Sequence, residues 1–305
     1  MFSFRVNFNR RKLSGQSMTK IDQFESIFRS ASKEKFEPEE VRVDRVAVIT
    51  DKDEQGSQAF VQEVQGFLGV FAEEYAPKWE VINRDEFSNV SELLGQLDDK
   101  KPDLICTYRN LRSPATEYPY SLGVYIDVLT QATDVPILLM PRMELQSDAQ
   151  TQKITKVGTA KVMAITDHLA GDHRLVNVAS KLVKSGGQLL LTHVEDQFYF
   201  DRMLTVIDKI AEIDSDVAKQ AIMEQLLADP RDYIESCRAV IEPRENVTVE
   251  SIVTFGHLMN DHRRLIEENE IDLLILHTKD DDQLAMHGLA YPIAVEIRTI
   301  PMLML

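Results

Sequence analysis

Four histidines follow or end short apolar runs that are typical of β-strands: His168, His193, His257 and His277. The carboxyl ends of parallel strands lie along one edge of a sheet, where ligands bind, so we expect these side chains to approach one another. Imidazole nitrogens, together with a carboxylate such as Asp167, are ligands that suit zinc. The four histidines are therefore candidate ligands of a metal ion such as zinc.

The sequence leaves the chemistry of such a site open. A metal ion with one open coordination position supports hydrolysis, but the chain has no His-Glu-x-x-His motif, no His-x-His pair and no residue that stands out as a nucleophile. The alternative is structural, because a histidine at a strand end can hydrogen-bond to a backbone carbonyl group. Metal binding and carbonyl capping both stand as interpretations.

The apolar runs alternate with helix-like segments along most of the chain. Predicted strands cover residues 46–51, 79–83, 103–107 and 135–140 in the first half, and 162–167, 188–194, 247–255, 271–276 and 301–305 in the second. Between strands, apolar residues recur at helical spacing, as at Phe60, Val64 and Phe67. This alternation predicts an α/β fold with two tandem, doubly wound parallel-sheet domains of Rossmann type, the first one shortened.

The two halves form a repeat in which the first copy is shorter. Residues 45–51 match residues 161–167, and a glycine precedes a proline by thirteen residues in both copies, at Gly123 and at Gly288. The first copy lacks one strand and a long helical insert. We therefore divide the chain into an N-terminal extension (1–40), a shortened domain (41–141), a linker (142–157) and a complete domain (158–305) with its insert at 198–245.

The extension and the insert differ from the rest of the chain. The first twenty residues hold five Lys or Arg and no acidic residue, which indicates a leader or a partly disordered extension, with Met18 as a second candidate start. The insert carries an apolar stripe that includes Met203 and Ile207, which predicts a helical cover over the sheet or a partner surface. Asp229 and Pro230 predict a break there, with Asp229 as the N-cap of a new helix.

Composition disfavours several classes of partner. The formal net charge of −16 argues against nucleic acid and anionic membranes, since both bind positively charged surfaces. No apolar run approaches the roughly 18 residues needed to cross a bilayer. Cys106 and Cys237 lie far apart and form no Cys-x-x-Cys pair, which favours a reducing, cytoplasmic location.

Several ordered segments resemble the universal stress protein family in its tandem, two-domain form. They are the opening strand that ends in Asp167, Leu-Leu-Thr-His-Val at 190–194, Val-Thr-Phe-Gly at 253–256 and Pro-Met-Leu-Met-Leu at 301–305. The resemblance covers residues 158–305 well and 41–141 loosely. It implies open five-stranded sheets, and regulatory roles in stress more often than catalysis. It also implies that the domains pair through their last strands, which begin at Val135 and Pro301 and end at Met140 and Leu305.

The nucleotide-binding branch of that family has Gly-x-x-Gly, nine residues and then Gly-Ser or Gly-Thr after the fourth strand, so that backbone amides approach phosphates. Here only Gly288 of the motif is present, and Asp280, Asp281 and Asp282 add negative charge to the loop. The first copy also lacks the motif, although its Arg109 and Arg112 could attract an anion. The resemblance therefore implies no ATP binding in the family manner.

The ligand-binding edge that the resemblance implies comprises five positions, Asp51, Gly123, Asp167, Gly256 and Gly288. We predict a non-catalytic, stress-related protein that binds a small molecule or a protein partner, with a homodimer left open. Two alternatives stand beside this prediction. One is a metal-binding sensor or metal-dependent hydrolase that uses the four histidines, and the other is an ATP-binding stress protein with a degenerate loop.

Overall fold

The structure is a computed structural model that describes most of the chain. The described residues are 34–71, 76–114, 118, 120–142, 147, 154, 157–166, 169–209, 215–278 and 290–305. Asp167, His168 and Gly288 lie outside them, as do the three aspartates of the 280–282 loop and nearly all of the predicted extension and linker. Among the described residues, no helix is long and apolar enough to span a membrane.

Nine strands form one sheet in the described part of the chain. They are β1 (Arg45–Ile49), β2 (Lys78–Ile82), β3 (Leu104–Tyr108), β4 (Ile137–Met140), β5 (Lys161–Ile165), β6 (Gln188–Asp196), β7 (Thr248–Gly256), β8 (Leu273–Leu276) and β9 (Met302–Met304). Their order is β2-β1-β3-β4-β9-β8-β5-β6-β7, and every neighbouring pair is parallel except β4 and β9. The predicted fold class is therefore confirmed, with two doubly wound parallel groups and one strand fewer in the first.

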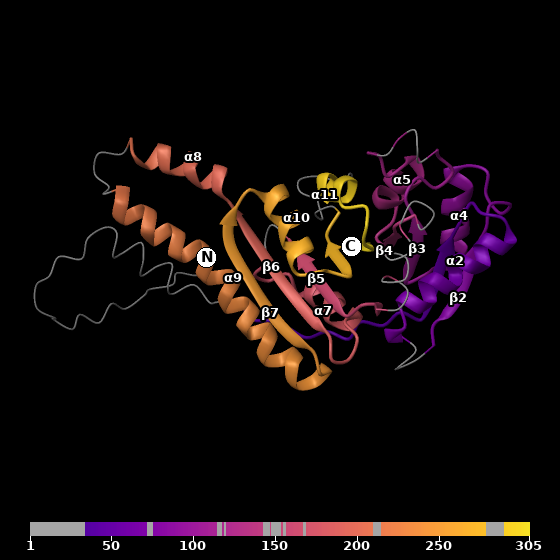
Figure 1. The fold of residues 1–305 in the computed structure, drawn as a ribbon, viewed down its shortest axis with the longest axis horizontal. Coiled ribbons are helices and arrows are strands. Elements are labelled where there is room, and N and C mark those ends of the chain that lie inside the picture. Colours follow the sequence, from indigo (N-terminus) through magenta and orange to yellow (C-terminus); the bar gives the residue numbers. More distant parts are fainter. Residues whose placement is uncertain are drawn as a thin grey trace, which may run out of the picture. The chain divides into compact units, whose positions relative to one another are not determined.

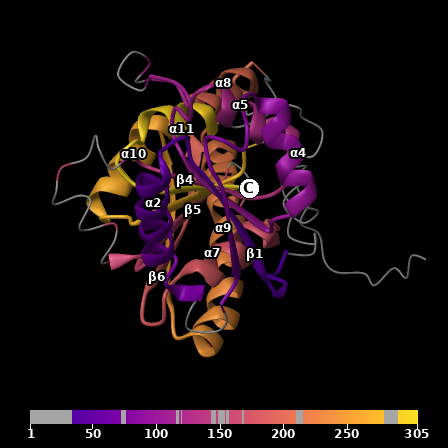
Figure 2. The ribbon, with the colours of Figure 1, turned by 90° about the vertical axis from the view of Figure 1, so that its right-hand side faces the viewer.

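Helices connect the strands (Figure 1). They are α2 (Glu54–Phe67), α4 (Val90–Lys100), α5 (Val124–Ala132), α7 (His173–Leu182), α8 (Gln197–Ile207), α9 (Ser215–Glu245), α10 (Leu258–Glu268) and α11 (Ala290–Glu296). Right-handed crossovers place a helix on one face when the chain moves outward along the sheet and on the other face when it returns. Accordingly, Figure 2 shows α2 and α4 on opposite sides of the strands of the first half.

Local sequence explains where the helices begin and which face they bury. The side chain of Asp53 accepts a hydrogen bond from the backbone N–H of Gly56 and so caps α2, whose residues Phe60, Val64 and Phe67 are buried at helical spacing. Asn89 caps α4 in the same way through the N–H of Glu92. These caps satisfy backbone donors that have no partner inside the helix.

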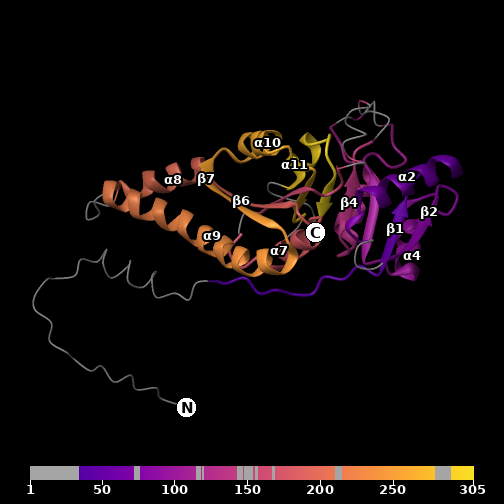
Figure 3. The same ribbon diagram turned by 60° about the horizontal axis from the view of Figure 1, so that its bottom comes forward.

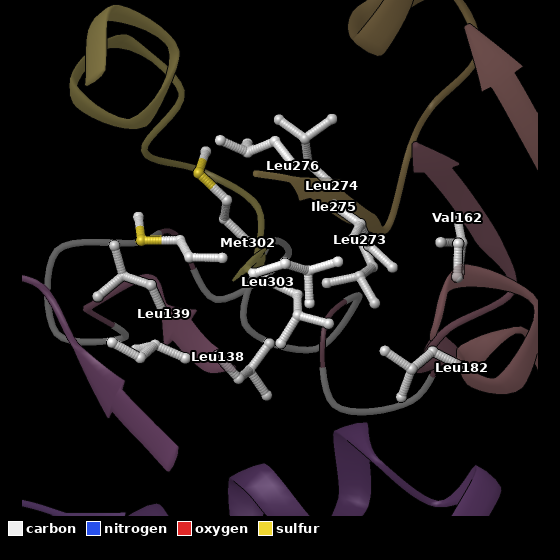
Figure 4. Packing of buried hydrophobic residues seen from close by; sticks show 14 of the residues in the cluster. Leu138, Leu139, Val162, Leu182, Leu273, Leu274, Ile275, Leu276, Met302 and Leu303 are labelled. Carbon is white, nitrogen blue, oxygen red and sulfur yellow. The ribbon is translucent and has the colours of Figure 1, made fainter. Parts of the chain in front are cut away.

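The two halves join through β4 and β9. Leu138 lies opposite Leu303 in the antiparallel register, and the central strands β3, β4, β8 and β9 are buried along their whole length. Figure 4 shows Leu138, Leu139, Met302 and Leu303 packing together, beside Leu273 and Leu274 of β8. Because each fully buried aliphatic side chain contributes roughly 1.5–3 kcal/mol, this seam binds the halves into one hydrophobic core.

The insert covers the sheet with only part of its length. Tyr233, Ile234 and Cys237 of α9 are buried, and this part of the helix lies along β7 (Figure 3). Phe200 is the only buried residue of α8. The predicted break at Pro230 is wrong, because α9 continues through it; packing of the following turns against β7 offsets the roughly 3 kcal/mol that an internal proline costs.

Residues 34–43 form an extended strap before β1. The N–H of Phe36 donates to Ser236 Oγ at 2.9 Å, the N–H of Glu39 donates to Asn177 Oδ1 at 2.9 Å, and Asn177 donates back to the carbonyl of Glu37 at 3.0 Å. Figure 3 shows this segment passing α9 and α7 on its way to β1. The beginning of the first half is thus attached to helices of the second.

Candidate functional site

Asp51 follows β1 at the carboxyl edge of the first half and is held by its own chain. Its Oδ2 atom accepts a hydrogen bond from the N–H of Arg112 at 2.6 Å, and its Oδ1 atom accepts one from the hydroxyl of Tyr108, the last residue of β3. The guanidinium of Arg142 lies 3.8 Å from Oδ2. An amide, a phenol and a guanidinium, groups that could bind an external anion, are therefore directed at an internal carboxylate.

The arginines that follow β3 bind backbone carbonyls. Arg109 is buried and donates to the carbonyls of Ala294 and Ile297, at the end of α11 in the second half. Burial, together with the nearby charge of Arg298, lowers the pKa of Arg109 to about 9. A helix carboxyl end carries partial negative charge, which partly compensates this buried cation.

Arg112 and Arg142 also donate hydrogen bonds to backbone carbonyls, and these bonds fix the loop that begins at Arg109. Arg112 donates to the carbonyls of Arg84 and Phe87, and its guanidinium lies 4.5 Å from the centre of the Phe87 ring. Arg142 donates to the carbonyls of Arg109 and Asn110, at 3.0 and 3.2 Å. Arg112 and Arg142 thus hold this loop in place.

Two of the glycines predicted to lie at the ligand-binding edge, Gly123 and Gly256, have a role in packing. Gly123 has a φ of +92°, and a Cβ atom there would lie 2.9 Å from the Cα of Asn110. A Cβ atom at Gly256 would overlap the carboxylate of Asp261, which accepts a hydrogen bond from the N–H of His257 at 2.7 Å. Each glycine therefore lets another residue pack directly against its backbone, Asn110 at Gly123 and Asp261 at Gly256. Their role in ligand binding stays a prediction.

The described part of the second edge contains a His–Asp pair. His277, which follows β8, places Nε2 at 3.0 and 2.9 Å from the two carboxylate oxygens of Asp172. Asp172 also caps α7 by accepting a hydrogen bond from the N–H of Leu175. The pair joins the end of β8 to the start of α7, much as Tyr108 and Asp51 join the ends of β3 and β1.

The three described histidines of the predicted cluster have separate surroundings. Besides the pairing of His277, Nε2 of His193 lies 3.1 Å from Glu195 of the same strand, and His257 is the exposed N-cap residue of α10. His193 does not end its strand, because pairing with β7 extends β6 to Asp196. Among the described residues, no group of three or more His, Cys, Asp or Glu could hold a metal ion. With His168 outside those residues, the metal site stays a prediction.

Sequence reasoning missed Tyr108, Arg142 and Asp172 at these edges. The position of Asp172 just before a helix-like segment is the usual signal of an N-cap. Tyr108 and Arg142 gave no local signal, because Asp51, the partner of both, is distant in sequence. It lies 57 residues before Tyr108 and still farther before Arg142. Only the neighbouring positions of β1, β3 and β4 bring these three side chains together.

A cleft of about 560 Å³ lies beside β2 in the first half. Its lining combines two valines, four side-chain amides, a serine, two cations and two carboxylates: Val61, Val81, Gln58, Gln62, Gln65, Asn83, Ser57, Lys52, Arg84, Glu54 and Asp85. The cleft could not be predicted from the sequence, because its walls come from α2, from Val81 of β2 and from the turns that follow β1 and β2. Its lining carries no net formal charge, which distinguishes it from an anion site.

Comparisons with solved structures show a similar course of the backbone at low sequence identity. A functionally unknown protein from Pseudomonas aeruginosa PAO1 is 12% identical over 87% of this chain and 92% of that chain, with a TM-score of 0.48. A universal stress protein from Archaeoglobus fulgidus DSM 4304 is 13% identical over 85% of this chain and 95% of that chain, with a TM-score of 0.47. No protein-family model and no curated protein matches the sequence. Similarities of this size establish no family.

Proposed function

We propose that this protein is a non-catalytic regulatory protein that binds another protein through the exposed face of α8. The observation that carries the proposal is the exposure of three large apolar side chains on this one helix. Phe198, Tyr199 and Val206 are 69%, 68% and 59% exposed. Aromatic side chains exposed together on one helix are a common mark of a protein interface.

The three side chains share one face of α8. At 3.6 residues per turn they fall within an arc of about 100°. Phe200 lies on the opposite face, where it is buried and its ring centre is 4.9 Å from that of Phe255 in β7. One face of α8 therefore fastens the helix to the sheet, while the other presents two aromatic rings. Such a face fits an apolar pocket or groove on a partner, where buried aromatic rings contribute most of the binding energy.

The charged side chains at the carboxyl edges of the described strands are engaged inside the protein, which favours the proposal over ATP binding at these positions. Asp51, Arg109 and Arg112 are engaged by the chain itself, and Asp172 is engaged by His277 and by the cap of α7. A phosphate group would have to displace the carboxylate of Asp51 from the N–H of Arg112. The resemblance of residues 158–305 to universal stress proteins supports a role of this binding in stress adaptation.

A photo-cross-linker placed at position 199 tests the proposal. Tyr199→benzoylphenylalanine, expressed in the cell of origin, should give one discrete adduct with a different protein. Val206→Asp on the same face should reduce the adduct at least tenfold, because a charge would be buried without a partner. A cross-linker at Asp201, also exposed on α8 but outside the arc, is the matched control and should give none. An adduct between two copies, or one that Val206→Asp leaves unchanged, would overturn the proposal.

Purified protein separates the proposal from its alternatives. Magnesium ATP at 1 mM should leave the midpoint of thermal unfolding unchanged, whereas a site with a dissociation constant of about 10 μM would add about 2.7 kcal/mol of stability. Elemental analysis should find no stoichiometric zinc. Either saturable ATP binding or one zinc ion per chain would replace the proposal with the corresponding alternative.

A further inference from the structure

The second half contains a strand that has no described counterpart in the first. β6 lies between β5 and β7, and β7 pairs with it in parallel over nine residues. β2 occupies the same place in the first half, beside β1 as β6 lies beside β5, yet it ends the strand order of the described sheet. The repeat therefore indicates which element would complete this edge, namely a parallel strand outside β2.

The backbone of β2 is arranged to receive such a strand. Lys78 donates its N–H to the carbonyl of Asp44 at 2.8 Å, and the carbonyl of Ile82 accepts from the N–H of Thr50 at 3.1 Å, so these residues face β1. Alternate residues of a parallel strand direct their backbone groups to opposite sides. Trp79 and Val81 therefore direct N–H and C=O groups to the open side, where an edge strand can pair with another chain.

The cleft beside β2 lies where the side chains of an added strand would go. The side chain of Val81 is 37% exposed and lines this cleft together with Val61 and Gln62 of α2. In the second half, α9, which packs on β7, also packs against α7, the counterpart of α2. The cleft in the first half thus corresponds to space that the second half fills with its own chain.

We infer that the open edge of β2 binds an extended segment of a partner polypeptide, which adds to the sheet as a parallel strand. The lining of the cleft selects the kind of segment. Lys52 and Arg84 are balanced by Glu54 and Asp85, so an uncharged segment fits best. Alternate apolar side chains would contact Val61 and Val81, and amide or hydroxyl side chains would meet the glutamines of α2. Backbone hydrogen bonds supply affinity in this mode of recognition, and the alternate side chains supply specificity.

This inference does not depend on the proposed role of α8. β2 and β7 are at opposite ends of the strand order, and α8 follows β6 next to the β7 end. Loss of binding at one surface therefore leaves the other intact. A second copy of this chain is a different occupant, because strands related by a two-fold axis pair antiparallel, whereas the repeat indicates a parallel strand.

The chain itself supplies a probe, a nine-residue peptide with the sequence of β7 in which glutamine replaces Glu250 to remove the side-chain charge. The protein has one tryptophan, Trp79 in β2, and the peptide has none, so tryptophan fluorescence reports this edge alone. We expect a saturable fluorescence change with a dissociation constant below about 1 mM. Hydrogen exchange at the amides of Trp79 and Val81 should slow in the complex, and a scrambled peptide should do neither.

Two variants of Val81 give the decisive comparison. Val81→Pro removes an outward N–H without touching the bonds to β1, so it should weaken peptide binding at least tenfold while the circular dichroism spectrum stays the same. If that variant fails to fold, Val81→Lys places a charge on the edge and should have the same effect on binding. Peptide binding that survives Val81→Lys would overturn the inference. So would a dimer in analytical ultracentrifugation that Val81→Lys dissociates, because the edge would then serve a second copy.

Discussion

Each half carries a carboxylate near its first strand-to-helix turn that is bound by a residue from the next strand in space. Tyr108 at the end of β3 binds Asp51, and His277 after β8 binds Asp172. Partly buried carboxylates with such partners hold loops in one conformation, since an unpaired charge there would be costly. These pairs therefore favour a rigid strand edge in each half.

Substitution of Gly123 tests whether this position requires glycine. Gly123→Ala should destabilise the protein by roughly 1–3 kcal/mol, because its φ of +92° is unfavourable for other residues and its Cβ would meet the Asn110 backbone. Gly95→Ala is the matched control. Gly95 is exposed inside α4 and a Cβ atom there would meet open space, so alanine should stabilise by about 0.5–1 kcal/mol. Urea unfolding measures both, and the same sign for the two changes would contradict the expectation.

Among the elements, β9 has the most central position. This three-residue strand pairs with β4 of the first half on one side and with β8 of the second on the other. Its side chains are buried, and its residues belong to the core cluster that includes both halves. Both halves should therefore unfold together, although each has its own set of parallel strands.

Leu303→Ala tests this coupling. The side chain is buried, so its truncation should cost about 2–5 kcal/mol of unfolding free energy. The fluorescence of Trp79 reports the first half, and far-ultraviolet circular dichroism reports the whole chain. Both should show the same reduced midpoint in urea, because β9 belongs to a shared core. Val206→Ala on the exposed face of α8 is the control and should change the midpoint little. Separate transitions for the two signals would contradict the coupling.

At the level of the whole molecule, buried groups determine how stability responds to alkali. Burial raises the pKa of Cys106, Tyr108 and Tyr233 above their ordinary values, and raises the pKa of Cys237 to about 12. Above about pH 9 for the thiols and about pH 10 for the phenols, the unfolded chain loses protons that the folded protein keeps. The folded state then binds more protons, so its stability must fall as pH rises. Arg109 has the opposite effect, because its lowered pKa makes the folded protein lose a proton that the unfolded chain keeps. This single group does not outweigh the two thiols and two phenols.

The unfolding free energy should therefore be constant near pH 8 and decline from about pH 9 upward. Each group contributes up to about 1.4 kcal/mol per pH unit between its unfolded and folded pKa. Urea unfolding at pH 8, 9, 10 and 11 measures the slope. Tyr108→Phe should lower stability at pH 8 by loss of its hydrogen bonds, yet give a shallower decline above pH 10. An unchanged slope in this variant would contradict the assignment to Tyr108.

Local sequence was sufficient for the repeat and for most strands and helices, but not for α9, which continues through the break predicted at Pro230. Strands such as β3 and β8 are buried on both faces and appear as continuous apolar runs, and the helices show apolar residues at helical spacing with capping residues at Asp53 and Asn89. These signals depend on neighbours within a few residues, which is why the α/β class could be predicted. The end of β6 at Asp196 could not be predicted, because its last residues adopt the strand conformation by pairing with β7.

The strand-end histidines could be identified as candidates from their sequence positions, but their partners depend on how the elements assemble. Nε2 of His277 lies against Asp172, 105 positions earlier, and His193 faces Glu195 inside a longer strand. The open edge of β2 and the exposed face of α8 are likewise properties of the assembled sheet. Local pattern reports which face of an element is apolar, whereas partners and exposure depend on what other elements lie against that face.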